Sequence, residues 1–489
     1  MSGKTLRSSF TLVLSAMILA GCANYSGLDT QGQGLNAKSL KVGQSLNGVT
    51  LSPAAWPKSD WWTSLGDPQL DGLIREALHD SPDMQIAEAR AHQASAAAYA
   101  ADAERYPTLD ASAGISRSRL AKDQDPRGQG DAYATVRNVS AGFNYNFDLW
   151  GGQRDAWEAA LGQARAAEVD RQAAQLTLAA DVARAYSDLG QAHIVYDLAN
   201  DDLKRTKQML ELSQRRLSSG IDSQYQFQQT QSLEASSEAS LIDAEKRLNS
   251  AKIALAVLLG KGPDRGNEIA RPKILQASAV AVPSVLPAEL LGRRPDLVAA
   301  RWRVEAASKD IDSAKTRFYP NLNLTASAGA ESLLGDAMFG SASRFFNIAP
   351  TISVPIFDGG RLRANLDARD ADYDLAVAQY NKSLVKALGD VSDTINQLRD
   401  IGRQIGAQQH ATDIAQDSYN TVVQRYGSGI GNYLDVLSIE QQLLQAQRQL
   451  ANLNAEQIDL SIQLMQVLGG GFQGQTLTAA NARPATPHN

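Results

Sequence analysis

A set of landmark residues occurs twice along this 489-residue chain, at an offset of about 210 residues, and such a duplication limits the fold more than any single motif does. The recurring pairs are Pro82-Asp83 with Pro295-Asp296, Tyr106-Pro107 with Tyr319-Pro320, Phe147-Asp148 with Phe357-Asp358, and Leu259-Gly260 with Leu468-Gly469. Because the pairs keep one order and nearly one offset, the sequence predicts two tandem structural repeats, 76–290 and 291–470. We expect each repeat to contain a helix, a β-hairpin, a long helix and a return helix, with a C-terminal tail, 471–489, after the second.

The N-terminus has the features of a secretory signal followed by a lipid-attachment cysteine. A positively charged start precedes an apolar stretch, 10–20, that is too short to span a bilayer. Cys22 ends the sequence Leu-Ala-Gly-Cys, which resembles the bacterial lipobox, and it is the only cysteine, so no disulfide can form within one chain. We therefore expect a signal peptide, 1–21, a lipid on Cys22 and an N-terminal periplasmic segment, 22–75. The alternative is an ordinary signal peptide with a cysteine placed there by chance.

Four segments of roughly ten residues alternate apolar with polar side chains, which is the period of a β-strand. They are 109–116, 139–148, 321–328 and 347–356. The length suits a tilted transmembrane strand, and the polar set is mostly small or amide-bearing, which favours membrane strands over a half-buried soluble sheet. We expect two hairpins with polar loops near 118–132 and 331–345. Four strands cannot close a barrel, since the smallest transmembrane barrels have about eight, so this interpretation requires an oligomer.

Two proline-free stretches, 152–220 and 360–429, predict helices of about 100 Å. Each ends at a Gly-Ile pair, at Gly220 and at Gly429, where the chain can reverse because glycine ends helices at low steric cost. In the second return helix two adjacent apolar series indicate neighbours on both sides, as in a ring of helices; the core of a large bundle is the alternative. The series are Val436, Ile439, Leu443, Ala446, Leu450, Leu453, Gln457, Leu460, Leu464 and Val467, in which Gln457 is the one polar exception, and Leu437, Leu444, Ala451, Ile458 and Met465.

The composition argues against a nucleic-acid partner and against an enzyme. The formal net charge is -6, and the charged residues, 20% of the chain, are spread along it rather than gathered in a basic stripe. The triple glycine at 469–471 follows a predicted helix, whereas a phosphate-binding loop precedes one, so it is interpreted as a helix stop. The histidines show no metal-ligand spacing; they are His79, His92, His193, His410 and His488. We expect no catalytic residue, no metal site and no cofactor other than a covalent lipid.

Several of these motifs together resemble the TolC-type outer-membrane factors, in the lipid-anchored branch that includes OprM and the NodT-like proteins. The motifs are 147–152, 293–296, 318–320, 357–360 and 426–437. The resemblance implies an α+β membrane protein that forms a homotrimer. Each chain would give four transmembrane β-strands to a twelve-stranded β-barrel, which would continue into a long periplasmic α-helical barrel of coiled-coil helices.

The resemblance also implies a function. It suggests an outer-membrane exit duct, anchored by a palmitate-bearing Cys22, that passively conducts cargo from an inner-membrane pump of the RND or ABC type through a periplasmic adaptor protein. Efflux, as in multidrug resistance, is the expected role. The alternatives are the outer-membrane channel of a type I protein-secretion system and a non-channel periplasmic structural lipoprotein. The cargo could be a drug, a metal, an oligosaccharide or a protein.

By the same resemblance, the duct closes at its periplasmic tip, at the start of the last return helix. Leu434 and Asp435 would lie at the narrowing, and Ser438 falls where other members often carry a second acid. Asp222, beside the first turn, is a weaker gate candidate. From the residues alone, Asp435 is also explained as a first-turn acid that complements the helix dipole.

The two helix turns are where an adaptor would dock. The predicted docking residues are Arg216, Gly220, Arg425 and Gly429. An arginine near a helix C-terminus is also a good partner for the helix dipole, so the arginines have a structural explanation as well.

Overall fold

The computed structural model describes residues 24–36, 39–40, 51–52, 56–119, 133–273, 282–283, 292–333 and 338–473. The predicted signal peptide, Cys22 and residues 474–489 of the predicted tail lie outside the described residues. Two compact units are formed, each from segments that are distant in sequence. The first contains the chain up to Gly34 with His92–Ala167 and Ala300–Tyr380, and the second contains Leu35–Ala91, Glu168–Ala299 and the chain from Asn381. Each predicted repeat therefore contributes to both units.

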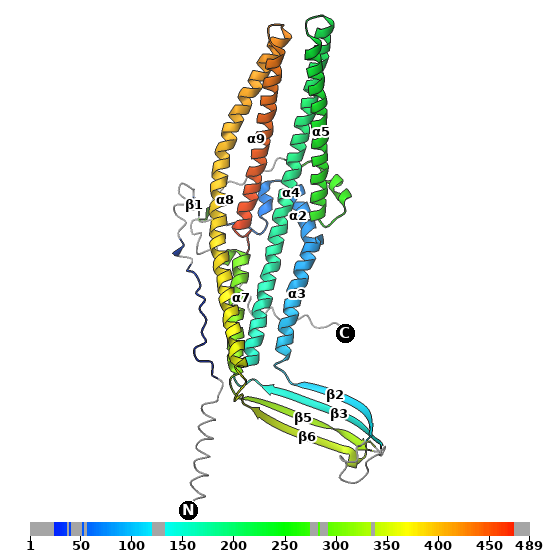
Figure 1. Ribbon diagram of the computed structural model, residues 1–489, viewed down its shortest axis with the longest axis vertical. Helices are drawn as coiled ribbons and strands as arrows, with labels where there is room; N and C mark the ends of the chain where they lie inside the picture. The colour runs from blue at the N-terminus through cyan, green and yellow to red at the C-terminus, as the bar shows by residue number, and fades with distance from the viewer. Residues whose placement is uncertain are drawn as a thin grey trace, which may run out of the picture. The chain divides into compact units, whose positions relative to one another are not determined.

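Helices make up most of the described chain (Figure 1). The α-helices are α2 (Pro68–Asp80), α3 (Pro82–Ala103), α4 (Gly152–Ser218), α5 (Gln224–Leu258), α7 (Pro295–Thr316), α8 (Arg361–Gly427) and α9 (Tyr433–Val467). The two long helices α4 and α8 have 67 residues each, and the return helices α5 and α9 have 35 each. The predicted proline-free helices are thus confirmed. Helix α2 runs across the predicted boundary between residues 75 and 76.

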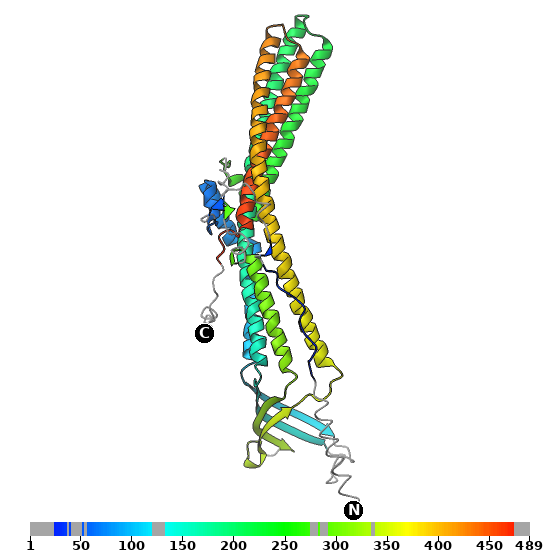
Figure 2. The same ribbon diagram turned by 90° about the vertical axis from the view of Figure 1, so that its left-hand side faces the viewer.

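In the second unit, α4 with α5 and α8 with α9 form two helical hairpins that reverse at matching turns (Figure 2). Gly220 has φ 73° and Gly429 has φ 80°, in the left-handed region that side chains avoid. The N–H of Ile221 donates to the carbonyl of Arg216, which closes the first turn. Ser223 and Gln226 then form a capping box that starts α5. The Gly-Ile pairs therefore end the long helices as the sequence predicts.

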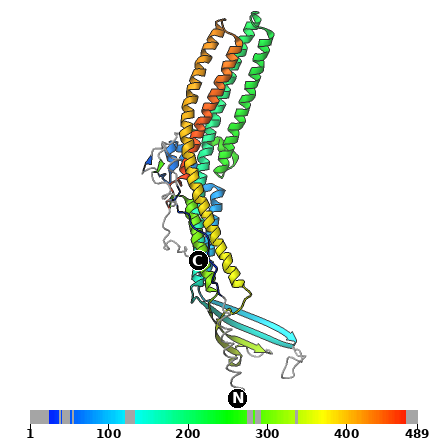
Figure 3. The ribbon, with the colours of Figure 1, turned by 60° about the vertical axis from the view of Figure 1, so that its left-hand side comes forward.

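The first unit contains one antiparallel sheet in the order β2-β3-β5-β6 (Figure 3). The strands are β2 (Thr108–Arg119), β3 (Tyr133–Phe147), β5 (Asn321–Leu333) and β6 (Arg344–Ser353). The register places Leu109, Phe143, Ala326 and Ile348 in one row across the sheet, and Asp110, Gly142, Ser327 and Asn347 in the next row. Successive rows point to opposite faces, so one face is apolar and the other polar.

The strand ends differ from the sequence prediction in two ways. The fourth strand was predicted at 347–356 but spans Arg344–Ser353, because the chain leaves the sheet before Pro355. Within one chain β6 is an edge strand, which is where a sheet tolerates a proline such as Pro350. The hairpin strands also extend further than predicted: β2 reaches Arg119 and β5 reaches Leu333, inside the segments predicted as loops.

The remaining elements are short, and all but one of them belong to the second unit. They are β1 (Leu51–Ser52), η2 (Trp61–Leu65), η4 (Pro263–Glu268) and β4 (Val282–Pro283), with β1 and β4 paired in parallel; η5 (Ser341–Ser343) belongs to the first unit. Leu70 and Ile74 are fully buried against Tyr186 of α4. The hydroxyl of Tyr186 donates to Asp67 at 2.6 Å, and burial raises the pKa of this tyrosine. The predicted N-terminal segment is thus part of a core.

A strap formed by residues 24–34 lies along α8 in the first unit. The N–H groups of Gln31 and Gly32 both donate to Asp374, at 3.0 and 2.6 Å, and Arg363 donates to the carbonyl of Asn24. A Cβ at Gly32 would lie 2.9 Å from Asp374 Oδ1, so glycine permits this close approach. Tyr25 packs edge-on against Phe318. The strap was not predicted, because residues 24–34 have no periodic pattern.

Candidate functional site

The turn between α4 and α5 is fixed by a buried carboxylate. Arg216 Nε lies 3.0 Å from Asp222 Oδ1, and the hydroxyl of Tyr426 donates to Asp222 Oδ2 at 3.1 Å. The Arg216 guanidinium also stacks 4.5 Å from the centre of the Tyr426 ring. Asp222 is 8% exposed, so these two partners replace the water that it loses. The contacts tie the end of α4 to the end of α8.

This geometry joins residues that the sequence assigned to different roles. Asp222 was a gate candidate and Arg216 a docking candidate, and they form one ion pair. Arg425 is the repeat counterpart of Arg216, but it is exposed. Tyr426 begins the motif 426–437, but the sequence predicts no contact for it, because its hydrogen bond to Asp222 spans 204 residues of sequence. Burial, with Asp222 adding to it, raises the pKa of Tyr426 to about 12, so its hydroxyl remains a donor at neutral pH.

The start of α9 has one buried and one exposed face. Asn432 caps the helix by accepting a hydrogen bond from the N–H of Leu434. Tyr433 is 2% exposed, and its hydroxyl lies 2.5 Å from that of Thr230 on α5. Leu434, Asp435 and Ser438 are all exposed, so the three predicted gate residues share one surface. The carboxylate of Asp435 is therefore exposed to water, whereas that of Asp222 is buried beside Arg216.

The buried face of this region forms a small core of its own. Met209 of α4, Tyr426 of α8, and Tyr433 and Val436 of α9 make up the core, and the two tyrosine rings lie 5.8 Å apart. Glu440 follows Val436 by one helical turn and is 2% exposed. The sequence series missed Glu440 because they counted apolar residues, although its spacing from Val436 and from Leu443 is that of a core position.

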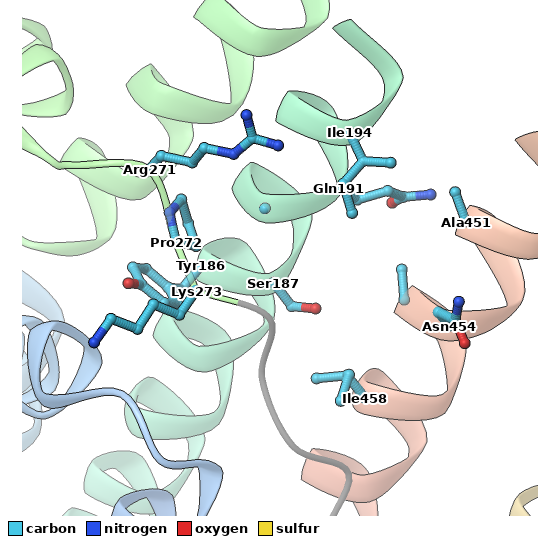
Figure 4. A pocket seen from close by; sticks show the side chains of 12 residues that line it. Tyr186, Ser187, Gln191, Ile194, Arg271, Pro272, Lys273, Ala451, Asn454 and Ile458 are labelled. Carbon is cyan, nitrogen blue, oxygen red and sulfur yellow. The ribbon is translucent and has the colours of Figure 1, made fainter. Parts of the chain in front are cut away.

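A separate pocket of about 130 Å³ lies between α4, α9 and residues 271–273 (Figure 4). Ile194, Pro272 and Ile458 are among its apolar lining residues. Its arginine, Arg271, is already paired with Asp197 at 2.5 Å, and Figure 4 shows the ammonium group of Lys273 turned away from the other lining side chains. The pocket therefore directs no unpaired charge at a ligand, and the predicted site residues lie elsewhere.

Among the parts of the chain that the structure describes, no group of three or more His, Cys, Asp or Glu side chains is arranged to bind a metal ion. Over the same described residues, no helix combines the length and the apolar character needed to cross a membrane.

Comparison with known proteins identifies the family. The profile of the outer membrane efflux proteins matches residues 73–261 and 286–470. The chain belongs to this family. The match covers the described hairpins, the long helices and the return helices. The resemblance to outer-membrane factors that the sequence motifs indicated is thus confirmed.

Individual outer membrane efflux proteins are similar over most of their length. The fusaric acid resistance protein FusA of Burkholderia cepacia is 35% identical over 364 residues, which cover 73% of this chain and 68% of FusA. The multidrug resistance outer membrane protein MdtP of Escherichia coli K12 is 29% identical over 468 residues, which cover 94% of this chain and 95% of MdtP. The crystal structure of the outer membrane protein VceC of Vibrio cholerae matches with a TM-score of 0.78 and 34% identity, covering 86% of this chain and all of VceC.

Membership in the outer membrane efflux family decides the location and the class of activity. This efflux protein resides in the outer membrane and acts as an efflux channel, not as an enzyme.

Proposed function

We propose that this chain is the outer-membrane exit duct of a tripartite efflux system, which passively conducts cargo delivered by an inner-membrane pump of the RND or ABC type and a periplasmic adaptor protein. The observation that carries the proposal is the four-stranded sheet with one apolar and one polar face, joined to two helices of 67 residues. The resistance proteins among its relatives favour efflux over type I protein secretion, which would use the same architecture.

The duct is a homotrimer in this proposal. Within the described sheet, β2 and β6 each pair on one side only, so each chain has two free edges. Pairing β2 of one copy with β6 of the next would join three sheets into a twelve-stranded barrel and remove every edge. The apolar row with Leu109 and Ile348 would then face lipid, and the polar row would face the lumen.

The helices would continue this barrel as a helical duct across the periplasm. The equal lengths of α4 and α8, and of α5 and α9, support a tandem duplication with repeats at 76–290 and 291–470. Exposed apolar side chains on the helices support contacts with neighbouring copies; Ile242 and Ile253 of α5 are 62% and 47% exposed.

A palmitate-bearing Cys22 would anchor the chain in the outer membrane after removal of the signal peptide. The strap supports this placement, because Tyr25, three residues after Cys22, packs against Phe318, two residues before the Pro320 that leads into β5. A lipid on Cys22 would therefore have a short tether to the level at which the strands begin.

The exposed face at the start of α9 would form the periplasmic gate. Three copies of Leu434, Asp435 and Ser438 around one axis would combine an apolar ring with a ring of carboxylates that favours cations. Asp222 would act at the same tip through its contacts with Arg216 and Tyr426. The adaptor would dock at the turns that carry Gly220 and Gly429, with Arg425 exposed for contact.

Assembly tests the proposed duct directly. After purification in mild detergent, we expect a particle with three times the mass of one chain that forms mostly closed pores of small conductance in a planar bilayer. A water-soluble monomer that forms no pores would contradict both the shared barrel and the duct.

The gate makes a separate prediction. Replacing Asp435 by Ala should lower the preference for cations over anions severalfold in low salt, because three lumen charges are lost. The effect should shrink in 1 M salt, where the screening length is about 3 Å. Ser438→Asp should change selectivity in the opposite direction, and Asp413→Asn, at an exposed position of α8, is the control. Equal reversal potentials for all variants would remove Asp435 from the pore.

A further inference from the structure

Helix α9 carries a carboxylate in its buried core, close to the proposed gate. Tyr433, Val436, Glu440 and Leu443 follow one another at spacings of three and four, and they are 2%, 0%, 2% and 0% exposed. Glu440 thus occupies a position that its neighbours fill with apolar side chains. It lies five residues from Asp435, or about 7–8 Å along the helix. The proposed functions of Leu434, Asp435 and Ser438 give no role to this side chain.

Glu440 shares one cation with a second buried carboxylate. Arg205 Nε lies 3.4 Å from Glu440 Oε1, and Arg205 Nη2 lies 3.7 Å from Asp202 Oδ1, both at ion-pair rather than close hydrogen-bond distances. Both oxygens of Glu440, Asp202 Oδ1, and Nε and Nη2 of Arg205 are buried without a hydrogen-bond partner. Two carboxylates therefore compete for one guanidinium inside the α4–α9 contact, and the cluster is negative when both are ionised.

The groups that face Glu440 come from three helices. Asp202 and Arg205 belong to α4, Tyr419 to α8, and Tyr433 to α9 itself. Burial, with repulsion from Asp202 adding to it, raises the pKa of Glu440 from 4.5 to about 7 although Arg205 opposes the shift. Burial also raises the pKa of Tyr419 to about 12, so this tyrosine does not titrate in the same range. Glu440 is thus the group of this cluster that changes charge near neutral pH.

We propose that Glu440 is a proton-operated switch for the start of α9, and through it for the gate residues that this helix carries. In the protonated state, Arg205 pairs with Asp202 alone and the neutral Glu440 packs between Val436 and Leu443. In the ionised state, the cluster retains an uncompensated negative charge, and α9 is held less tightly against α4. The second step, from helix to gate, rests on the proposed function of the helix tip.

Glu440 holds its proton more strongly in the folded state than in the unfolded state, and this difference sets the direction of the pH dependence. The α4–α9 contact is strongest below pH 4.5 and weakens as the pH rises through about 7. A shift of one pKa unit is a tenfold change in an equilibrium constant. The equilibrium constant for the closed arrangement, in which α9 packs tightly against α4, should therefore fall on the order of a hundredfold across this range. The duct should therefore be more closed in an acidified periplasm.

The test uses the full-length, lipid-modified protein in planar bilayers, at about pH 5.5 and about pH 8, on either side of the transition. We expect the open probability of the unmodified protein to rise severalfold at the higher pH, and Glu440→Gln to stay closed at both. Asp202→Asn leaves Arg205 to Glu440 alone and should move the transition to lower pH. Glu456→Gln, at an exposed position of α9, should respond as the unmodified protein does.

Hydrogen exchange of residues 433–443 provides a readout that needs no pore. We expect protection to fall with rising pH in the unmodified protein relative to Glu440→Gln at the same pH. An identical pH response of the unmodified protein and Glu440→Gln, in conductance and in exchange, would overturn the switch while leaving the duct intact. Trimers without conductance at either pH would overturn the duct, and loss of the pH-dependent protection in Glu440→Gln would then still support the switch within the helices.

Discussion

Gly329→Val should abolish assembly of the protein in the outer membrane. A Cβ on Gly329 would lie 2.2 Å from the carbonyl oxygen of Val139 and 2.8 Å from the Cα of Ser140. Both are backbone atoms of β3, so they cannot move aside as a flexible side chain would. Because β3 and β5 are the pair that joins the two hairpins, the clash separates the sheet into halves. We expect a cost of about 3 kcal/mol or more per chain, at the upper end for overpacking.

Gly142→Val is the matched control for this prediction. Gly142 lies in β3 on the same face of the sheet, and the nearest atom to a Cβ there is the carbonyl oxygen of Asp110 at 4.0 Å. Valine has a high β propensity, so the two variants differ only in the space available. The measurement is the amount of heat-sensitive oligomer in outer-membrane fractions on unboiled gels. Wild-type amounts of oligomer for Gly329→Val would mean that β3 and β5 do not pair in the assembled protein.

The strands were predictable because a sheet with one apolar face imposes a period of two on the sequence. Alternation at 139–148 and 321–328 identified β3 and β5, although β3 already begins at Tyr133 and β5 continues to Leu333. Their pairing register was not predictable, since alternation fixes the face of a side chain but not its partner on the next strand. The long helices were predictable from the absence of proline, and their ends from the Gly-Ile pairs, because only a few residue types accept the left-handed conformation at such turns.

The cluster at the tip of the helices was predictable only in part, from the duplicated turns. The turns located Arg216 and Asp222 near one another, but the third member, Tyr426, comes from the other repeat, and no local pattern reports a contact of that kind. Glu440 was missed for a different reason: charge usually marks an exposed face, and here a charged residue occupies a core position. Such a conflict between residue type and position is typical of functional sites.

Asp222→Ala should loosen the tip of the helices more than any other single substitution there. The change leaves Arg216 without its carboxylate in a setting where the Asp222 side chain is 3% and the Arg216 side chain 18% exposed. Removing one partner of a buried ion pair costs about 3–5 kcal/mol, because the remaining charge stays desolvated. The hydroxyl of Tyr426 loses its acceptor at the same time. We expect faster hydrogen exchange at residues 216–226 and 422–427, and a larger leak conductance in planar bilayers.

Two further variants distinguish the contribution of the buried ion pair from that of net charge at the tip. Tyr426→Phe keeps the ring that stacks on Arg216 but removes one hydrogen bond, so it should cost about 1 kcal/mol and accelerate exchange only slightly. Asp435→Ala removes the same charge from an exposed position and should change stability by less than about 0.5 kcal/mol. We therefore expect the largest acceleration of exchange for Asp222→Ala, a smaller one for Tyr426→Phe and the smallest for Asp435→Ala. This order would show that one buried carboxylate holds α4 and α8 together. If Asp435→Ala accelerated exchange as much as Asp222→Ala, net charge at the tip rather than the buried contact would control its opening.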